Sequence, residues 1–124
     1  MTAPNIVNTS SIIGITTAVV LSTTNSTLFL SNPSGSNKVF RINNITTSNI
    51  DGTNNADITI RYHTSAAGGG TGIALANTIT IPAGSALVAV GKDNQFYLEE
   101  DRSFTAQASV ANDLAIFCTY EEIT

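Results

Sequence analysis

Apolar residues in this chain recur at every second position, in short runs that turn-forming residues separate. Such alternation covers residues 58–63, 78–81, 104–110 and 114–120, and Asn, Asp, Gly, Pro and Ser gather between the runs. A period of two places one set of side chains on each face of a strand, and no stretch shows the spacing of an amphipathic helix. The pattern predicts an all-β fold, an antiparallel β-sandwich of jelly-roll or immunoglobulin-like type. Helix is expected to be limited to a turn or two.

The predicted strands belong to a single domain at 11–124, preceded by an extended N-terminal arm at 1–10. The arm contains Pro4 and lacks alternation, yet it holds the apolar residues Ile6 and Val7. We expect it to order only against a neighbouring subunit or the surface on which the protein assembles. The predicted strands are 12–22, 26–31, 38–48, 56–64, 73–81, 85–91, 95–99, 103–110 and 114–122. The predicted core is Ile42, Ile58, Ile60, Ile79, Ile81, Leu98, Phe104, Leu114, Ile116 and Cys118.

Few side chains in this sequence can do acid–base or metal chemistry. The chain has one histidine, one cysteine, 5 basic and 9 acidic residues among 124. Catalysis near neutral pH uses titratable groups gathered in a pocket, and metal sites use several His, Cys or carboxylate ligands. We therefore predict a protein that is not an enzyme, with no catalytic residue, no metal site and no cofactor.

Two acidic stretches are the best candidates for a cation site. Glu99 and Asp101 would share one face of a strand end while Glu100 points the other way, and paired carboxylates can bind calcium or serve catalysis. The segment from Asp51 to Asp57 is rich in oxygen ligands. It lacks the glycine and the glutamate of an EF-hand loop, whose places hold Ala56 and Tyr62. A solvated strand end and a tight turn are the preferred interpretations, and calcium at either place is left open.

Three further features invite a chemical interpretation that their surroundings do not support. The glycine-rich segment Gly68–Gly72 matches neither nucleotide-binding fingerprint, and we interpret it as a flexible hairpin tip. His63 lies on an alternating strand without a second histidine, which favours a surface or interface role. Cys118 stands in an apolar run and is interpreted as a small buried hydrophobe.

Charge and hydropathy limit the partners of the chain. The net charge is −4 and the five basic residues are scattered, so a basic footprint for nucleic acid is absent from the sequence. No apolar run approaches the ~20 residues that span a bilayer, and the first residues do not form a signal peptide. The alternating strands carry few charges of the kind that discourage edge-to-edge association. We therefore expect a protein that packs against copies of itself or against a host surface.

Four segments of the sequence resemble small virion structural proteins of tailed phages, particularly phages of marine bacteria and cyanobacteria. They are Ile50-Asp-Gly-Thr-Asn-Asn-Ala-Asp-Ile-Thr-Ile60, Ile81-Pro-Ala-Gly-Ser-Ala-Leu-Val88, Lys92-Asp-Asn-Gln-Phe-Tyr-Leu-Glu-Glu100 and Cys118-Thr-Tyr-Glu-Glu-Ile123. The resemblance spans almost the whole chain, and its motifs are turns and strands. The family has glycine after the acidic pair, where this chain has Asp101.

The resemblance implies a β-sandwich that is assembled in many copies on the virion. The favoured hypothesis is a capsid decoration (cement) protein, a homo-oligomer and most simply a trimer, which binds and reinforces the major capsid protein lattice. Its place would be the virion, most simply the capsid surface, after synthesis in the host cytoplasm. The alternative is a tail, neck or fibre component, or a receptor- or glycan-binding module. A glycan-binding head needs exposed aromatic side chains, and Tyr62, Tyr97 and Tyr120 are the tyrosines that could provide them.

Overall fold

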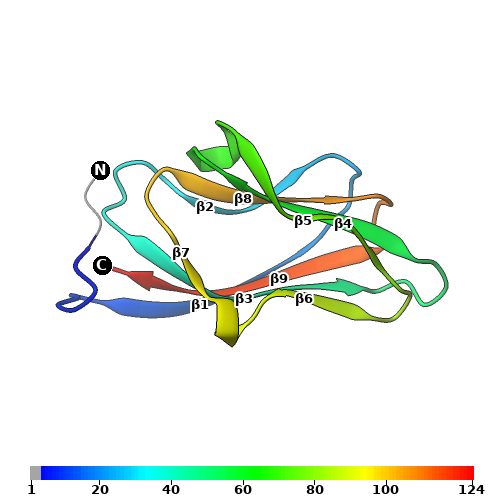
Figure 1. Cartoon of the computed structure of the whole chain (residues 1–124), viewed down its shortest axis with the longest axis horizontal. Coiled ribbons are helices and arrows are strands. Elements are labelled where there is room, and N and C mark those ends of the chain that lie inside the picture. The colour runs from blue at the N-terminus through cyan, green and yellow to red at the C-terminus, as the bar shows by residue number, and fades with distance from the viewer. Residues whose placement is uncertain (1–3) are drawn as a thin grey trace.

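The computed structural model describes residues 4–124, in which nine strands form two antiparallel sheets packed face to face (Figure 1). Sheet A has the order β1 (Ile12–Val20), β9 (Leu114–Ile123), β3 (Val39–Asn49) and β6 (Ala86–Val90), and β7 (Phe96–Leu98) also pairs with β3. Sheet B has the order β2 (Thr27–Asn32), β8 (Arg102–Ala108), β4 (Ala56–His63) and β5 (Gly72–Ile81). Two 3₁₀ turns, η1 (Ala66–Gly68) and η2 (Lys92–Asn94), complete the elements.

The predicted all-β sandwich is confirmed, and its topology is that of a jelly roll. Each of the nine predicted strands is present, with ends that differ by at most two residues. The chain passes from one sheet to the other at most connections, which gives the strand orders β1-β9-β3-β6 and β2-β8-β4-β5. This order pairs strands far apart in sequence, as double-sheet jelly rolls do.

Large aliphatic side chains from both sheets fill the space between the layers. Nine of the ten predicted core residues are at most 1% exposed, and the prediction for Ile79 is wrong, since that residue is 39% exposed. Ile79 lies opposite the buried Ile58 and faces the same side of sheet B. Because β5 is the last strand of the sheet, no further strand covers Ile79 there. The core also includes residues that the prediction left out: Leu21, Phe29, Leu30, Ile45 and Val90.

Two buried asparagines join the sheets at opposite ends of the sandwich. Asn49 of β3 donates its amide to the carbonyl oxygens of Asn54 and of Ile81 in β5, at 3.0 and 2.9 Å. Asn32 of β2 donates in the same way to the carbonyl oxygens of Lys38 and of Leu98 in β7. Both side chains are at most 3% exposed. Buried polar groups need such partners, and for each asparagine one partner is a backbone carbonyl of the facing sheet and the other a backbone carbonyl of a loop.

The described part of the N-terminal arm packs near the C-terminus. A turn joins the amide of Asn8 to the carbonyl of Asn5, and Ser11 exchanges backbone hydrogen bonds with Thr124. Pro4 and Ile6 line a shallow depression with Val39, Tyr97 and Glu99, whereas Val7 is 91% exposed. The ordering of the arm against a neighbour stays a prediction, and residues 1–3 lie outside the described residues.

Candidate assembly surfaces

In the acidic stretch at 99–101, the carboxylates of Glu100 and Asp101 are used separately, each as a hydrogen-bond acceptor. Glu100 is 3% exposed and accepts a hydrogen bond from the amide of Gly35, while Glu99 is exposed. Asp101 has φ +57°, in the left-handed region that favours glycine. Its carboxylate accepts the amide of Ala66 at 3.0 Å.

The glycine-rich connection between β4 and β5 folds back over sheet B. Besides the bond to Asp101, the amides of Ala67 and Gly68 donate to the hydroxyls of Ser31 and Ser103. Ser103 is fully buried and donates in turn to the carbonyl of Ser65. As predicted, the segment links two paired strands. It does not project freely but lies against β8 and β2, above which it is drawn in Figure 1.

The second acidic stretch forms a turn. Asp51 accepts hydrogen bonds from the amide of Thr53 and the side chain of Asn54, and these bonds lower the pKa of Asp51. Partial desolvation and the neighbouring Asp51 charge raise the pKa of Asp113. Asp57, at the far end of the stretch, accepts the hydroxyl of Thr80. Across residues 4–124, no three His, Cys, Asp or Glu side chains are grouped as a metal site requires.

His63 and Cys118 lie far apart in the fold. His63 is half-buried on the outer face of sheet B, where its Nε2 lies 2.7 Å from the hydroxyl of Thr105. Cys118 is 1% exposed between the sheets, and burial raises the pKa of its thiol to about 12. The interpretation of Cys118 as a buried hydrophobe is confirmed. A thiol in this position is neither ionised nor accessible for a disulfide with another chain.

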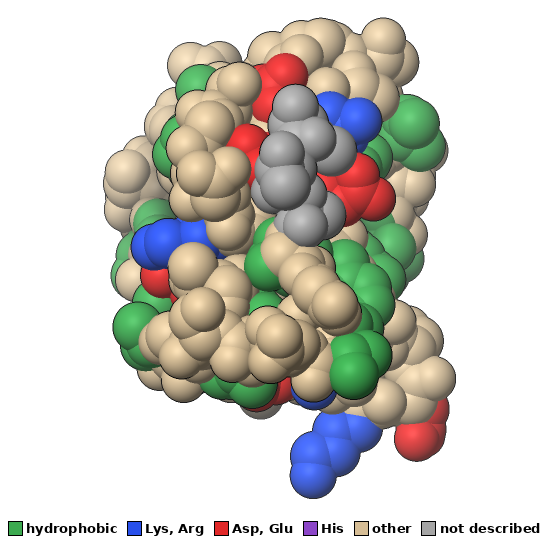
Figure 2. All heavy atoms as spheres, turned by 90° about the vertical axis from the view of Figure 1, so that its left-hand side faces the viewer, with side chains coloured by type: hydrophobic (Ala, Val, Ile, Leu, Met, Phe, Trp, Pro, Cys, Tyr) green, Lys and Arg blue, Asp and Glu red, His purple; other side chains and the backbone are tan. Residues whose placement is uncertain are grey.

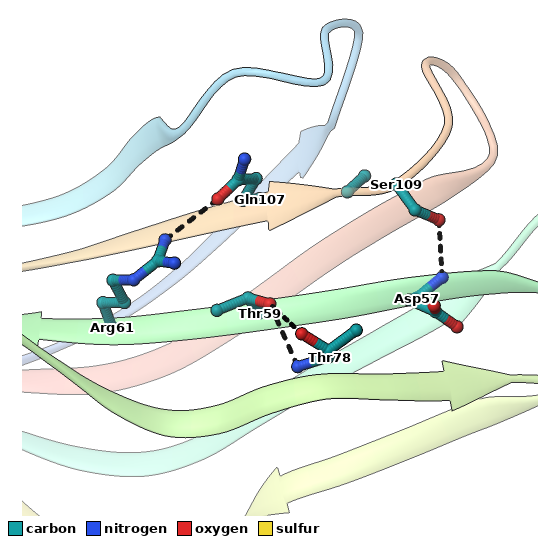
Figure 3. Close-up of a pocket in the computed structure, with 7 residues that line it drawn as sticks. Asp57, Thr59, Arg61, Thr78, Gln107 and Ser109 are labelled. Atoms are coloured by element: carbon teal, nitrogen blue, oxygen red, sulfur yellow. Dashed lines mark hydrogen bonds between the residues drawn. The ribbon is translucent and has the colours of Figure 1, made fainter.

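The outer face of sheet B holds a polar depression of about 210 Å³ (Figure 3). Its residues bond to one another: the guanidinium of Arg61 donates to Gln107 at 3.0 Å, and the hydroxyls of Ser109 and Thr59 accept the backbone amides of Asp57 and Thr78. Its lining contains no aromatic residue. The lining therefore offers no aromatic ring on which a sugar could stack.

Of the three tyrosines, only Tyr97 is exposed. Tyr62 packs edge-on against Phe104, and Tyr120 packs against Phe40, so both rings serve the core. Tyr97 is 43% exposed and lies beside the guanidinium of Arg41. Figure 2 shows the end of the sandwich where both termini lie, with charged and hydrophobic side chains interspersed. The ion pairs at this end join Lys38 to Glu122 and Arg41 to Glu121.

The edge strands of both sheets are uncharged, and this distinguishes them from the central strands. In β1, β2, β5, β6 and β7 there is no Asp, Glu, Lys, Arg or Pro. Proteins ordinarily protect sheet edges with such residues, because an edge presents unpaired backbone groups to other chains. The charged side chains of the strands all lie in the central ones: Arg41, Asp57, Arg61, Arg102, Glu121 and Glu122.

The outer face of sheet A adds an apolar row that crosses the sheet. Ala18, Phe117, Thr46 and Val88 are successive neighbours on β1, β9, β3 and β6. Phe117 is 40% exposed and Val88 59%. Contiguous exposed apolar patches can mark contact surfaces, so this row is a candidate of that kind.

The distribution of charge along the sequence carries a signal for these surfaces that the sequence analysis missed. Residues 1–37 and 62–91 contain no Asp, Glu, Lys or Arg. These two stretches contain β1, β2, β5 and β6, the outer strands of both sheets. In the part of the chain that the structure describes, no helix is long and apolar enough to cross a membrane.

No known family matches this sequence, and no curated protein matches it. Among solved structures, the chain is similar to a protein described under "Bacillus endospore appendages form a novel family of disulfide-linked pili". The TM-score is 0.53 at 16% identity, over 92% of this chain and 88% of that chain. At this identity the likeness establishes a shared fold across nearly the whole length of both chains.

Proposed function

We propose that this chain is a structural subunit, without enzymatic activity, that assembles in many copies through its sheet edges and its outer apolar face. The observation that carries the proposal is the absence of charge and proline from every outer strand. An edge strand of that composition has no charge to repel another strand and no proline to block its backbone hydrogen bonds. Selection for a free monomer favours the opposite arrangement, with charges at the edges.

The specific assembly that we propose is the surface of a phage capsid, where the chain acts as a decoration protein on the major capsid protein. The resemblance of the sequence to phage virion proteins supports this assignment, and jelly rolls are frequent in viral capsid proteins. Fold alone does not decide function. The apolar row through Phe117 and Val88 would face the capsid, where repetition over a lattice compensates for weak single contacts. A trimer is the oligomer that the resemblance implies, and any two-fold contact between chains would link one trimer to the next.

A second candidate is a fibre, tail or neck component, and the likeness to an appendage protein favours it. That protein belongs to a family described as disulfide-linked. Cys118 is the one cysteine of this sequence and is buried between the sheets. A fibre of the present chain would therefore be held together by non-covalent contacts.

Copy number separates the two candidates. Co-expression with a phage major capsid protein from the same genome, followed by electron microscopy of the purified particles, measures occupancy on the lattice. Regular density at hundreds of lattice positions is expected for a decoration protein. Filaments of the purified chain alone, with bare capsids, would support the fibre candidate in its place.

A pair of variants tests the docking face. Val88→Lys places a charge in the apolar row and is expected to reduce occupancy on capsids. Ile50→Lys is the matched control, since Ile50 is an apolar residue of similar exposure, 57% against 59%, and lies between β3 and β4, outside the edge strands and the apolar row. Equal occupancy for the two variants would contradict the assignment of sheet A to the capsid.

A further inference from the structure

The edge of sheet A at β1 presents a regular row of unpaired backbone groups. Ser11 exchanges both backbone hydrogen bonds with Thr124, and the amide of Leu21 donates to the carbonyl of Leu114 at 2.8 Å. Bonding alternates in an antiparallel pair, so the odd-numbered residues of β1 bond to β9. The outward N–H and C=O groups belong to the even-numbered residues: Ile12, Gly14, Thr16, Ala18 and Val20.

The sequence of β1 is close to a palindrome in size and shape. Read from either end, Ile-Ile-Gly-Ile-Thr-Thr-Ala-Val-Val gives two β-branched aliphatic residues, a small residue and then β-branched residues around Thr16. An interface between two identical surfaces about a two-fold axis must be complementary to itself. Thr16 is the central residue of the strand, and its side chain is exposed.

We infer that β1 pairs antiparallel with β1 of a second copy, about a two-fold axis through Thr16, so that sheet A continues from one copy into the other. In this register Ile12 lies opposite Val20 of the second copy and Gly14 opposite Ala18, while Thr16 meets its own copy. Large residues then face large ones and small face small. All nine residues of each strand are paired, which no shifted register achieves.

The same register satisfies the backbone and the side chains together. The five outward residues of each strand form five hydrogen-bonded pairs, so about ten new backbone hydrogen bonds form. Ile12, Ile13 and Val20 are 53%, 54% and 48% exposed in the single chain and lie at the two ends of the new contact. Cross-strand pairs of β-branched residues stabilise sheets. No charge on β1 opposes the approach.

Among residues 4–124, β9 is the only strand that pairs with β1. The side of β1 that faces away from β9 is therefore open to a second copy. The other outer strands offer a poorer two-fold contact. In β2 the register to β8 shifts between Leu28 and Leu30, β6 has five residues, and the ladder of β5 with β4 is interrupted twice. β1 pairs with β9 over all nine residues without a shift. A flat, regular strand is the better template for a further strand.

This inference rests on the proposed self-assembly and is tested by charge reversal at the axis. Thr16→Lys and Thr16→Glu each place two like charges opposite one another in the pair, which destabilises it. Sedimentation over a range of concentrations should show association weakened about tenfold or more in each variant. An equal mixture of the two should restore association as a mixed pair. Unchanged melting temperatures would verify that both variants fold.

Ala86→Lys is the matched control, because Ala86 is an exposed small residue on the same outer face, at the opposite edge of sheet A. It should leave association unchanged. Undiminished association of Thr16→Lys, or weakening by Ala86→Lys in its place, would overturn the pairing. A protein that is monomeric at every concentration, yet occupies capsids, would overturn the pairing and leave the proposed function standing. Capsids without bound protein, together with a chain that does not associate with itself, would contradict both the pairing and the proposed function.

Discussion

The central and outer strands of this sandwich divide two tasks between them. The central strands β3, β4, β8 and β9 bury their inner side chains almost completely and carry all the Asp, Glu and Arg side chains of the strands. The outer strands β1, β5 and β6 leave many apolar side chains exposed and carry no charge. Burial of apolar surface stabilises a fold in proportion to the area removed from water. The centre therefore accounts for the stability of the single chain, and the edges retain apolar surface for association.

The sharpest way to break this comparison is to remove the same group in both regions. Ile60→Ala and Ile116→Ala, in central strands, should each lower the free energy of unfolding by ~2–5 kcal/mol, because a cavity is left among fully buried neighbours. Ile79→Ala, at the edge, deletes the same atoms where water already reaches them. Its cost should stay below that of both central variants. Denaturant unfolding measures all three.

The Cys118 thiol offers an independent readout of the same variants. It is buried among the residues that the central substitutions disturb, and the burial that raises its pKa to about 12 also protects it from thiol reagents. Labelling of Cys118 under native conditions should accelerate in Ile60→Ala and Ile116→Ala and stay slow in Ile79→Ala. Equal unfolding midpoints and labelling rates in the three variants would show that centre and edge do not differ.

A second prediction concerns the buried amide that joins centre and edge. Asn49→Ala removes the bonds from β3 to the carbonyls of Asn54 and Ile81 and leaves these acceptors without their partner. Unsatisfied buried groups cost ~1–3 kcal/mol each, so thermal unfolding should reveal a loss in that range or above. Asn77→Ala on β5 is the control, since Asn77 is exposed, and its effect should be within ~0.5 kcal/mol of zero.

The sequence predicts the strands well and the neighbours of each strand poorly. Alternation and turn residues set the nine strand ranges, because these are local properties of the chain. Alternation is the same in an outer and a central strand, so it could not distinguish the half-exposed Ile79 from the buried Ile58. The bridging roles of Asn32 and Asn49 were missed because asparagine beside a turn is ordinarily a solvated turn residue. Long-range pairing places these amides against carbonyls of the facing sheet.

The sequence predicts that the chain has a surface for association, and the structure is needed to show where on the molecule that surface lies. Scarcity of charge indicated a chain suited to association. The structure adds that the charge-free stretches 1–37 and 62–91 contain four of the five outer strands, β1, β2, β5 and β6, which depends on a strand order that no local pattern encodes. The left-handed backbone of Asp101 could not be predicted for the same reason. It allows the Asp101 carboxylate to accept the amide of Ala66, and this contact depends on how the loop folds back.

A third prediction sharpens the comparison by improving the centre. Thr47 of β3 is fully buried, and its hydroxyl has no hydrogen-bond partner among the described residues. Thr47→Val replaces this hydroxyl with a methyl group of similar size. The unfolding free energy should rise by about 1 kcal/mol, because an unsatisfied buried hydroxyl costs roughly that much or more. A lower melting temperature for Thr47→Val would mean that the hydroxyl is satisfied in solution.

The smallest expected effect is the change in stability of the isolated chain when a charge is placed on an outer strand. Thr16→Lys and Ala86→Lys place charges on the two edges of sheet A, at side chains that are already exposed. Exposed substitutions away from special features are ordinarily worth less than ~0.5 kcal/mol, so the stability of the isolated chain should hardly change in either variant. Calorimetry on dilute samples, where association is negligible, measures this value without a contribution from the contact between copies. A large loss of stability in the dilute monomer would mean that the bare edges serve the fold itself. Near-neutral values would instead leave association as the reason why thirty-three residues of outer strand contain no charge at all.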